Sequence, residues 1–551
     1  MKKIIFILGL AAVVLGTSCS DVLDLNPADR FSPATVWSTT TTPDKYVIGL
    51  SSIFGANTEM RGGDAYASPR LSDAYSDILK STSWNQYNHN FNATLLQETA
   101  FNSNSAGAFE CWSSHYDRIR RENEFLRDAA EFGSKFGEDW LKIRIAEVRF
   151  CRAYAYFMLC RVYGGVILRT EVDGPEQNDK ARSTEEECWG FIINELKELA
   201  PDLPLKWDSD NSGRATQKAA YGLLSRVALY AEKWDVAAQA ARDCATAEGN
   251  LDLSENGYAK IFELGINSPE VLFAVEFKSS VIDHAYDAYV RPSGDTKELG
   301  KQVYSGFVPT SELVDSYEMA GDGGNFSWEK HGKDPYANRE PRFYATILYN
   351  GADWMGRKIE SFVGGKDGYK AYENAGAAGT TVTGYYLRKY LIDGDKTWVT
   401  SGSGQDWIVL RYAEVLLNKA EALAMENWNK NSAEALQALN DVRARVGLPA
   451  RATADKETFL EYVRHERKVE LAGEGFRYWD LRRWRLAEKV IDGQNVHGVK
   501  ISKQSDGSFT YEQVDADGGH KRIFYDRYYR FAIPLSERSN NSLCTNNDGW
   551  I

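Results

Sequence analysis

The sequence lacks every short motif that would mark a familiar catalytic centre. It contains no GxSxG, P-loop, HExxH or GxGxxG pattern, which argues against the serine hydrolase, nucleotide-binding and zinc protease classes. Its seven histidines are scattered, with no two at metal-ligand spacing on one predicted helix. A glycosidase needs only two carboxylates that the fold brings together, but among 78 acidic residues nothing marks such a pair. We therefore expect a protein that is not an enzyme.

Basic charge and paired cysteines are also scarce. The formal net charge of −13 argues against a nucleic-acid partner, which would require a basic face. None of the seven cysteines forms a CxxC pair, so neither a zinc site nor a dense disulfide framework is indicated. Residues 208–213 begin like an EF-hand loop, but Ala219 occupies the twelfth position, where a bidentate Glu is required. We expect no cofactor or metal, and leave open only a structural calcium ion.

The N-terminus has the pattern of an export signal. Basic residues precede the apolar run Ile4–Leu15, and the small residues 16–18 lead to Cys19. The run is too short for a membrane-spanning helix, which needs about 20 apolar residues. We predict a lipoprotein signal peptide at 1–18 and a lipid anchor on Cys19. Ordinary secretion with an incidental cysteine is the alternative.

Helical patterns and aromatic residues are abundant. Aromatic residues make up 13% of the chain, with 15 Trp and 30 Tyr. The stretch Arg411–Arg485 predicts three consecutive helices, over 411–430, 433–449 and 457–484. In the third, four charged residues recur at spacings that allow pairing along one helix. They are Glu466, Arg467, Glu470 and Glu474. Earlier helices are predicted over 43–54, 109–130, 139–163, 185–199, 216–233 and 234–247.

Two helix pairs share one design, with alanines where the helices would cross. One pair spans 221–245 and the other 412–445, which predicts a tetratricopeptide-like repeat interrupted by the insertion 249–406. Strand-like or hairpin-like pieces are predicted at 270–277, 342–349, 497–514 and 521–534. We predict a mainly α fold, in which a tetratricopeptide-like helical-repeat scaffold carries long loop-rich insertions and a few short β-hairpins.

Several segments, spread in a shared order from the signal to the last residues, match one protein family. They are CSDVLDLNP at the start, WSSHYDRIRREN (112–123), AEVRFCRAYAYFMLCRVYGGVIL (146–168), GRATQKAAYGLLSRVALY (213–230), NREPRFYATILYNGADW (338–354), GYYLRKY (384–390), EGFRYWDLRRW (474–484) and IPLSERSNNSLCTNNDGW (533–550). In this order they resemble the SusD/RagB family of outer-membrane lipoproteins of the Bacteroidota. One departure is Ile167, where the family usually has Pro.

The resemblance implies a domain organisation and a function. It implies one SusD-like domain over 19–551, made of an N-terminal part 19–248, the insertion 249–406 and C-terminal helices and hairpins 407–551. Members sit on the extracellular side of the outer membrane, held by the lipid anchor. They form a lid over a SusC-like TonB-dependent transporter and capture a nutrient for import without catalysing a reaction. For most members that nutrient is an oligosaccharide, and for a minority, RagB among them, it is peptide.

The same resemblance implies where a glycan would bind. The family's site is built from the loop after the first helix and from loops of the insertion, where aromatic faces stack on sugars and polar groups bind hydroxyls. In the first loop we select Trp84, Asp64, Asp73, Tyr75, Tyr87 and Asn88. In the insertion we select Tyr286, Tyr289, Trp328, Trp354 and Arg357. A buried core aromatic is the competing interpretation of each ring.

The signature residues have a structural interpretation, and three functions other than glycan capture are considered. The signature residues Trp112, Tyr116, Trp479, Asp480, Arg483 and Trp484 are expected to be structural. The first alternative function is peptide capture, which the abundance of flat Trp faces disfavours. The second is a helical-repeat adaptor for other proteins, and a cell-surface hydrolase comes last.

Overall fold

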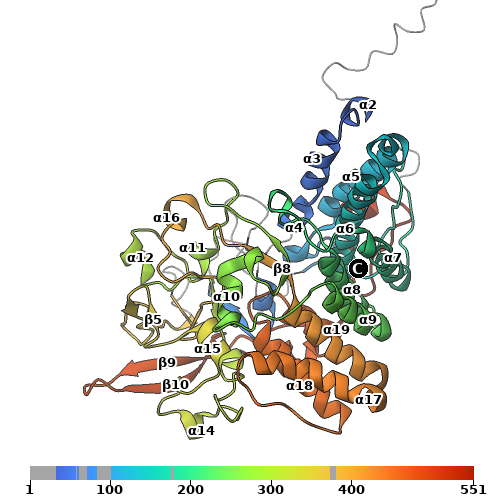
Figure 1. Cartoon of the computed structure of the whole chain (residues 1–551). Helices are drawn as coiled ribbons and strands as arrows, with labels where there is room; N and C mark the ends of the chain where they lie inside the picture. The colour runs from blue at the N-terminus through green and yellow to red at the C-terminus, as the bar shows by residue number, and fades with distance from the viewer. Residues whose placement is uncertain are drawn as a thin grey trace, which may run out of the picture.

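The computed structural model describes residues 33–56, 59–60, 71–82, 101–174, 179–372 and 380–550. The predicted signal peptide and lipidation site lie outside these ranges. No helix within them is long and apolar enough to cross a membrane. The described chain is a mainly helical scaffold with a few short strand pairs, so the predicted fold class is confirmed (Figure 1).

Within the described residues, eight α-helices precede the insertion, and local sequence explains several of their ends. The long helix α6 lies between Gly137 and Gly164, two glycines with positive φ that can end a helix at low cost. The helix α7 starts at a capping box, in which the Thr184 side chain accepts from the Glu187 backbone N–H and the Glu187 side chain bonds back. The eight are α2 (Pro33–Val36), α3 (Thr41–Leu50), α4 (Ser52–Ala56), α5 (Trp112–Phe132), α6 (Glu138–Tyr163), α7 (Glu185–Leu199), α8 (Gln217–Tyr230) and α9 (Trp234–Thr246).

The C-terminal helices differ in part from the prediction. The helix α17 (Tyr412–Arg445) covers the first two predicted helices, which meet at a kink where Asn427 leaves helical geometry. The third predicted helix is two, α18 (Lys456–Glu470) and α19 (Arg477–Arg483). Gly473 and Gly475, with φ of 76° and 78°, break it between them, because positive φ cannot continue an α-helix.

The helices form one side of the molecule and the insertion the other (Figure 1). Neighbouring helices pack in the order α5, α6, α7, α8, α9, α17 and α18, so the two predicted helix pairs lie side by side although about 160 residues of sequence separate them. The ends of the insertion come together because β2 (Val271–Val275) pairs antiparallel with β8 (Trp407–Arg411). The insertion thus leaves the helical scaffold and returns to it at the β2–β8 strand pair.

The remaining strands also form two-stranded antiparallel sheets. They are β1 (Leu79–Ser81) with β3 (Phe307–Pro309), β4 (Ile347–Leu348) with β7 (Tyr386–Leu387), β5 (Asp353–Trp354) with β6 (Arg357–Lys358), and β9 (His497–Lys503) with β10 (Phe509–Asp515). The predicted hairpin at 497–514 is present, but the strand prediction for 342–349 holds only at Ile347–Leu348, and the one for 521–534 is wrong. Most of 342–349 lies in α15 (Pro341–Thr346), and 521–534 contains a 3-10 turn at Asp526–Tyr529.

Short helices connect these strands. Those of the insertion are α10 (Gly257–Leu264), α11 (Tyr286–Val290), α12 (Asp295–Leu299), α13 (Ser311–Val314), α14 (Trp328–His331) and α16 (Trp398–Ser401). Near the C-terminus lie α20 (Ala487–Ile491) and α21 (Leu535–Asn540).

A buried network of charges fastens the insertion to the C-terminal helices. Glu470 of α18 accepts from Arg342 Nη1 at 2.9 Å, from Arg411 Nη1 at 2.7 Å and from Arg445. Buried charges are tolerated only when they are paired in this way, because each one loses its hydration. The network also includes Glu270, Glu318, Glu340, Lys389, Arg443, Glu466 and Glu474.

This network corrects the predicted charge pairing along the third helix. Glu466 and Glu470 bind arginines of other elements, and Arg467 Nε lies 2.7 Å from Asp480 Oδ2 on α19. The four charges face the interior, so their partners come from across the core.

Candidate functional site

Four of the predicted binding residues cannot be placed. Asp64, Trp84, Tyr87 and Asn88 lie outside the described residues, as does Cys19. Their roles stay predictions.

Asp73 lies inside the molecule, where it binds backbone. Its carboxylate accepts from the N–H groups of Gly473 at 2.9 Å, Gly475 at 3.2 Å and Arg477 at 2.9 Å. These bonds fasten the 3-10 turn Ser72–Tyr75 to the glycine turn between α18 and α19. Glu59, which accepts from the Ser72 backbone N–H at 3.0 Å, reaches the same turn. Asp73 is fully buried, so it offers no surface to a ligand in this conformation.

Tyr75 is buried in an aromatic cluster beside that turn. Its ring centroid lies 4.9 Å from that of Phe109 and 5.8 Å from those of Phe101 and Tyr478. It also forms part of the wall of a cavity described below.

Trp354 and Arg357 belong to one internal assembly. Trp354 is fully buried, and its Nε1 donates to Asp295 Oδ2 at 3.0 Å. The Arg357 guanidinium joins two carboxylates, with Nη2 at 2.7 Å from Asp295 and Nη1 at 2.6 Å from Asp367. Burial raises the pKa of Asp295, and the Trp354 and Arg357 donors oppose that rise. The assembly holds α12 against the β5–β6 hairpin.

Trp328 is half-buried. Its Nε1 donates to Asp315 Oδ2 at 2.9 Å, and its ring lies edge-on to Phe326 with a centroid distance of 5.5 Å. The Trp328 side chain is therefore held by other residues, while part of its ring stays accessible.

The short helix α11 carries two tyrosines that differ in burial. Tyr286 is fully buried, and its hydroxyl donates to the Lys389 carbonyl at 3.1 Å. Tyr289 lies half-buried and stacks on Tyr304, with centroids 4.7 Å apart and an interplanar angle of 19°. Tyr304 is 46% exposed, which makes the pair an aromatic face open to solvent. We call Tyr289 and Tyr304 the tyrosine pair.

Backbone hydrogen bonds join the two segments that carry the tyrosine pair. The Tyr304 N–H donates to the Ala288 carbonyl at 2.7 Å, and the Gly306 N–H donates to the Tyr289 carbonyl at 2.5 Å. Tyr304 was not among the predicted site residues, because it lies in a loop with no helix or strand period. Its proximity to Tyr289 follows only from the turn between α12 and β3.

The two chain regions selected from the sequence do meet beside the tyrosine pair. Strand β1 pairs with β3, and beyond it the Thr82 N–H donates to the Gly306 carbonyl at 3.0 Å and the Thr82 hydroxyl to the Ser305 carbonyl at 2.8 Å. The end of the described part of the first loop is therefore attached to the turn that carries Tyr304. A rigid, exposed aromatic face at such a junction can stack on the C–H face of a sugar ring.

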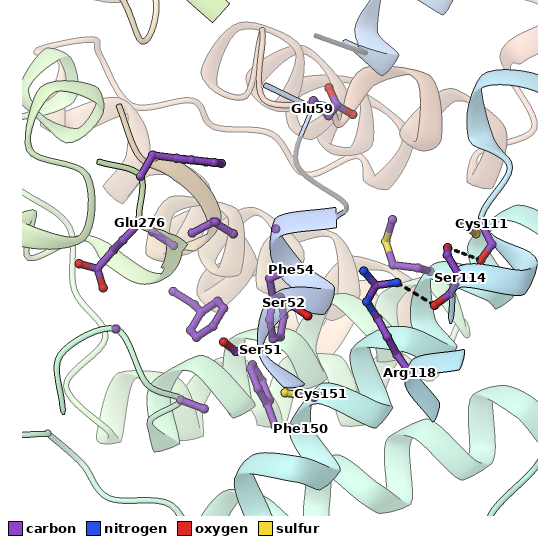
Figure 2. A pocket seen from close by; sticks show the side chains of 18 of the residues that line it. Ser51, Ser52, Phe54, Glu59, Cys111, Ser114, Arg118, Phe150, Cys151 and Glu276 are labelled. Carbon is purple, nitrogen blue, oxygen red and sulfur yellow. Dashed lines mark hydrogen bonds between the residues drawn. The ribbon is translucent and has the colours of Figure 1, made fainter. Parts of the chain in front are cut away.

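A cavity of about 1030 Å³ lies between the N-terminal helices and strand β2 (Figure 2). Apolar side chains form much of its wall, including Phe54, Phe150 and Phe273. Ile48 and Ile282, which are 52% and 53% exposed, line it where it reaches the surface. Except for Tyr75, the residues of this wall were not among the predicted site residues, since many come from helices whose apolar residues are typical of a core.

The described residues contain no group of three or more His, Cys, Asp or Glu side chains placed to hold an ion. In the EF-hand-like stretch, Asp208 instead caps a 3-10 turn by accepting from the Asn211 N–H at 3.0 Å.

Comparison with known sequences matches most of the chain. A family described as "SusD family" matches residues 269–550, and one described as "Starch-binding associating with outer membrane" matches residues 35–229. A SusD-like protein of Bacteroides ovatus is 24% identical over 547 residues, which cover 94% of this chain and 90% of the relative.

Solved structures show the same fold. A SusD-like protein from Bacteroides fragilis is 27% identical, with a TM-score of 0.80 and coverage of 94% of this chain and 98% of that one. A structure described as a laminarin-binding SusD-like protein is 21% identical, with a TM-score of 0.66 and coverage of 93% and 99%. The matches extend over both the helical scaffold and the insertion, and this chain belongs to the SusD family.

Proposed function

We propose that this protein is a non-catalytic glycan-binding lipoprotein of the outer membrane, and that the tyrosine pair forms part of its binding surface. The observation that carries the proposal is the exposed, rigid stack of Tyr289 and Tyr304 beside the first loop, in a chain of the SusD family. The descriptions of one matching family and of two similar structures support the proposal, since they mention starch, carbohydrate or laminarin binding.

The physical basis is a flat apolar face with polar groups around it. A pyranose ring has one face of C–H groups that packs on an aromatic ring, while its hydroxyls need hydrogen-bond partners. The tyrosine hydroxyls and the exposed side chains of Lys301 and Gln302 in the same turn can supply these. Because backbone bonds already order the turn, little entropy is lost on binding.

Family membership is the support for the partner and the location that we propose. We propose that Cys19 carries the lipid anchor, that the protein faces the extracellular side, and that it delivers oligosaccharides to a SusC-like TonB-dependent transporter. No catalytic step is proposed. Asp73 is fully buried and accepts from three backbone N–H groups, which gives it a structural role in the turn that it holds.

The test is binding to a panel of polysaccharides, laminarin and starch among them, by affinity electrophoresis and titration calorimetry. Tyr304→Ala should weaken binding about tenfold, since losing one stacking ring costs about 1–2 kcal/mol. Tyr304→Phe, which keeps the ring, should bind nearly as the wild type does. Tyr46→Ala, a change to an exposed ring on α3, serves as the matched control.

Trp84→Ala belongs in the same experiment, because Trp84 remains a predicted ligand. Loss of binding in that variant with Tyr304→Ala unaffected would move the site away from the tyrosine pair. Binding of peptides, with no polysaccharide bound, would replace the glycan proposal by the peptide alternative.

A further inference from the structure

The turn that carries Tyr304 contains a residue in a strained backbone conformation. Ser305 has a φ of 47°, in the left-handed region that residues other than glycine rarely adopt. Glu232, Glu248 and Arg485 also have positive φ, but each lies two residues past the end of a helix, where this conformation is common. Ser305 instead lies in the stretch that leads from α12 into β3. Strain of this kind persists only where surrounding contacts compensate for it.

Two hydrogen bonds hold Ser305 in this conformation. Its Oγ donates to the Arg291 carbonyl at 2.9 Å, and its own carbonyl accepts from the Thr82 hydroxyl at 2.8 Å. All three residues are buried, so removing either hydroxyl would leave a buried carbonyl without that donor. We call Thr82, Ser305 and Arg291 the hydroxyl chain.

The Arg291 end of the hydroxyl chain is held from several directions. Arg291 directly follows α11, and its backbone N–H donates to the Asp287 carbonyl at 3.1 Å. Its Nε donates to Asp287 Oδ1 at 2.9 Å, and its Nη2 donates to the carbonyls of Ile392 and Asp395 at 3.1 and 3.2 Å. The acceptor that Ser305 uses therefore belongs to a fixed part of the core.

The hydroxyl chain joins the two segments that carry the tyrosine pair. Ser305 follows Tyr304 directly, and Arg291 lies two residues after Tyr289. The same segments are joined by two backbone bonds, from the Tyr304 N–H to the Ala288 carbonyl and from the Gly306 N–H to the Tyr289 carbonyl. Of these three bonds, only the one from the Ser305 hydroxyl is made by a side chain, so it is the one that a substitution can remove.

We propose that Ser305 and Thr82 are positioning residues for glycan binding, which hold Tyr304 stacked on Tyr289 through the hydroxyl chain. Both side chains are buried, so they act through Tyr304 and not on the ligand. With the ring already held in place, less conformational freedom is lost when a sugar stacks on it. The effect on glycan affinity rests on the proposed function, whereas the ordering of the two rings does not.

The first test is affinity for laminarin or starch, whichever the wild type binds, by titration calorimetry. Ser305→Ala should weaken binding about three- to tenfold, as expected for the loss of one buried hydrogen bond. Ser305→Gly should weaken it as much, because glycine accepts a positive φ but also lacks the hydroxyl. Ser225→Ala, which removes a fully buried hydroxyl from α8, is the matched control and should bind as the wild type does.

Thr82 provides a second pair of variants with a conservative rescue. Thr82→Val removes the hydroxyl while keeping the shape of the side chain, and should weaken binding about two- to fivefold. Thr82→Ser keeps the hydroxyl and should bind nearly as the wild type does. If circular dichroism and thermal unfolding show that the Ser305 variants are not folded, this pair decides the question.

A second measurement detects the ring geometry without a ligand. Photo-oxidation with a ruthenium tris-bipyridyl complex and persulfate couples tyrosines in contact into dityrosine, which peptide mass spectrometry locates. The ring centroids of Tyr289 and Tyr304 are 4.7 Å apart, so the wild type should form this cross-link. Ser305→Ala and Thr82→Val should lower its yield at least threefold, and Ser225→Ala should leave it unchanged.

Unchanged cross-linking in folded Ser305→Ala and Thr82→Val would overturn the positioning role, whatever their affinity. Reduced cross-linking with undiminished affinity would overturn the link to glycan binding. Wild-type affinity in Ser305→Gly would show that the backbone conformation, and not the hydroxyl, positions Tyr304. The proposed function fails separately: if the wild type binds neither polysaccharide, the glycan role is lost, and cross-linking alone decides whether the hydroxyl chain orders the tyrosine pair.

Discussion

At the scale of single residues, the aromatic and charged side chains of the insertion divide by what their polar atoms bind. Trp354 and Tyr286 are fully buried, and each donates its one polar hydrogen to an internal acceptor. The tyrosine pair instead leaves ring surface open to solvent. Burial cannot be deduced from residue type, because the same rings serve cores and binding faces.

Arg357 was predicted from the sequence to bind a sugar hydroxyl, whereas in the structure it pairs with two carboxylates. Its replacement distinguishes the two roles. Arg357→Ala should lower the free energy of unfolding by about 3–5 kcal/mol, because it leaves the buried Asp367 without its cation and leaves Asp295 with only the more distant Arg291, at 3.5 Å. Chemical denaturation followed by circular dichroism measures the loss. Lys358→Ala, next in sequence and in an exposed pair with Asp353, is the control and should have little effect. A stable Arg357→Ala variant with impaired glycan binding would restore the ligand role.

Glu59 should make stability depend on pH. Burial raises the pKa of Glu59 to about 8, whereas in the unfolded chain it is about 4.3. The folded state therefore holds the proton more tightly, so the stabilisation is complete below about pH 4 and is lost as pH rises to 8. In Glu59→Gln, which mimics the protonated form, the urea midpoint should fall less between pH 5 and pH 8.5 than in the wild type. Identical slopes for the two proteins would contradict this assignment.

At the scale of elements, the turn between α18 and α19 joins three parts of the chain. Its glycines break the helix, present N–H groups to Asp73 and leave room for Glu59. A Cβ on Gly475 would lie 2.4 Å from Glu59 Oε1, and φ there is +78°. The sequence motif around these glycines is thus explained by a close approach of two segments.

Two glycine variants separate the cost of backbone strain from that of crowding. Gly447 has a φ of +72° with open space around its Cβ position, so Gly447→Ala should cost about 1–2 kcal/mol of stability from strain alone. Gly475→Ala carries the same strain and a clash, and should cost at least 1 kcal/mol more. Equal losses for the two, measured by denaturation, would show that Glu59 moves away freely.

At the scale of the whole molecule, a strand pair and a buried ion-pair network join the helical scaffold and the insertion. The strand pair β2–β8 closes the ends of the insertion, and the charge network centred on Glu470 binds its interior to α17 and α18. Both the strand pair and the charge network lie in the core, so the loops of the insertion stay available for ligands.

The anchoring of the whole molecule is tested in cells. Cys19→Ala should remove the lipid, so the protein should move from the membrane fraction to the soluble fraction while binding glycan as before. Metabolic labelling with palmitate provides an independent readout. Labelled, membrane-bound Cys19→Ala would contradict the predicted anchor.

The sequence alone determined the helical elements, the interrupted repeat and the family. Periodic apolar positions and capping residues depend on neighbours within a few residues, which is why the prediction of 185–199 agrees with α7 to the residue. Local signals gave a wrong prediction where they conflicted. Residues 342–349 are rich in residue types that favour strands, but Pro341 begins a helix just before them.

Only the tertiary structure decided what each candidate side chain does. It placed Trp354, Tyr286 and Asp73 in the interior and paired Tyr289 with Tyr304. Each outcome depends on contacts between segments tens or hundreds of residues apart. Hydrophobic patterns specify that a residue is buried or exposed far better than they specify its partner, because partners are chosen by packing across the whole core.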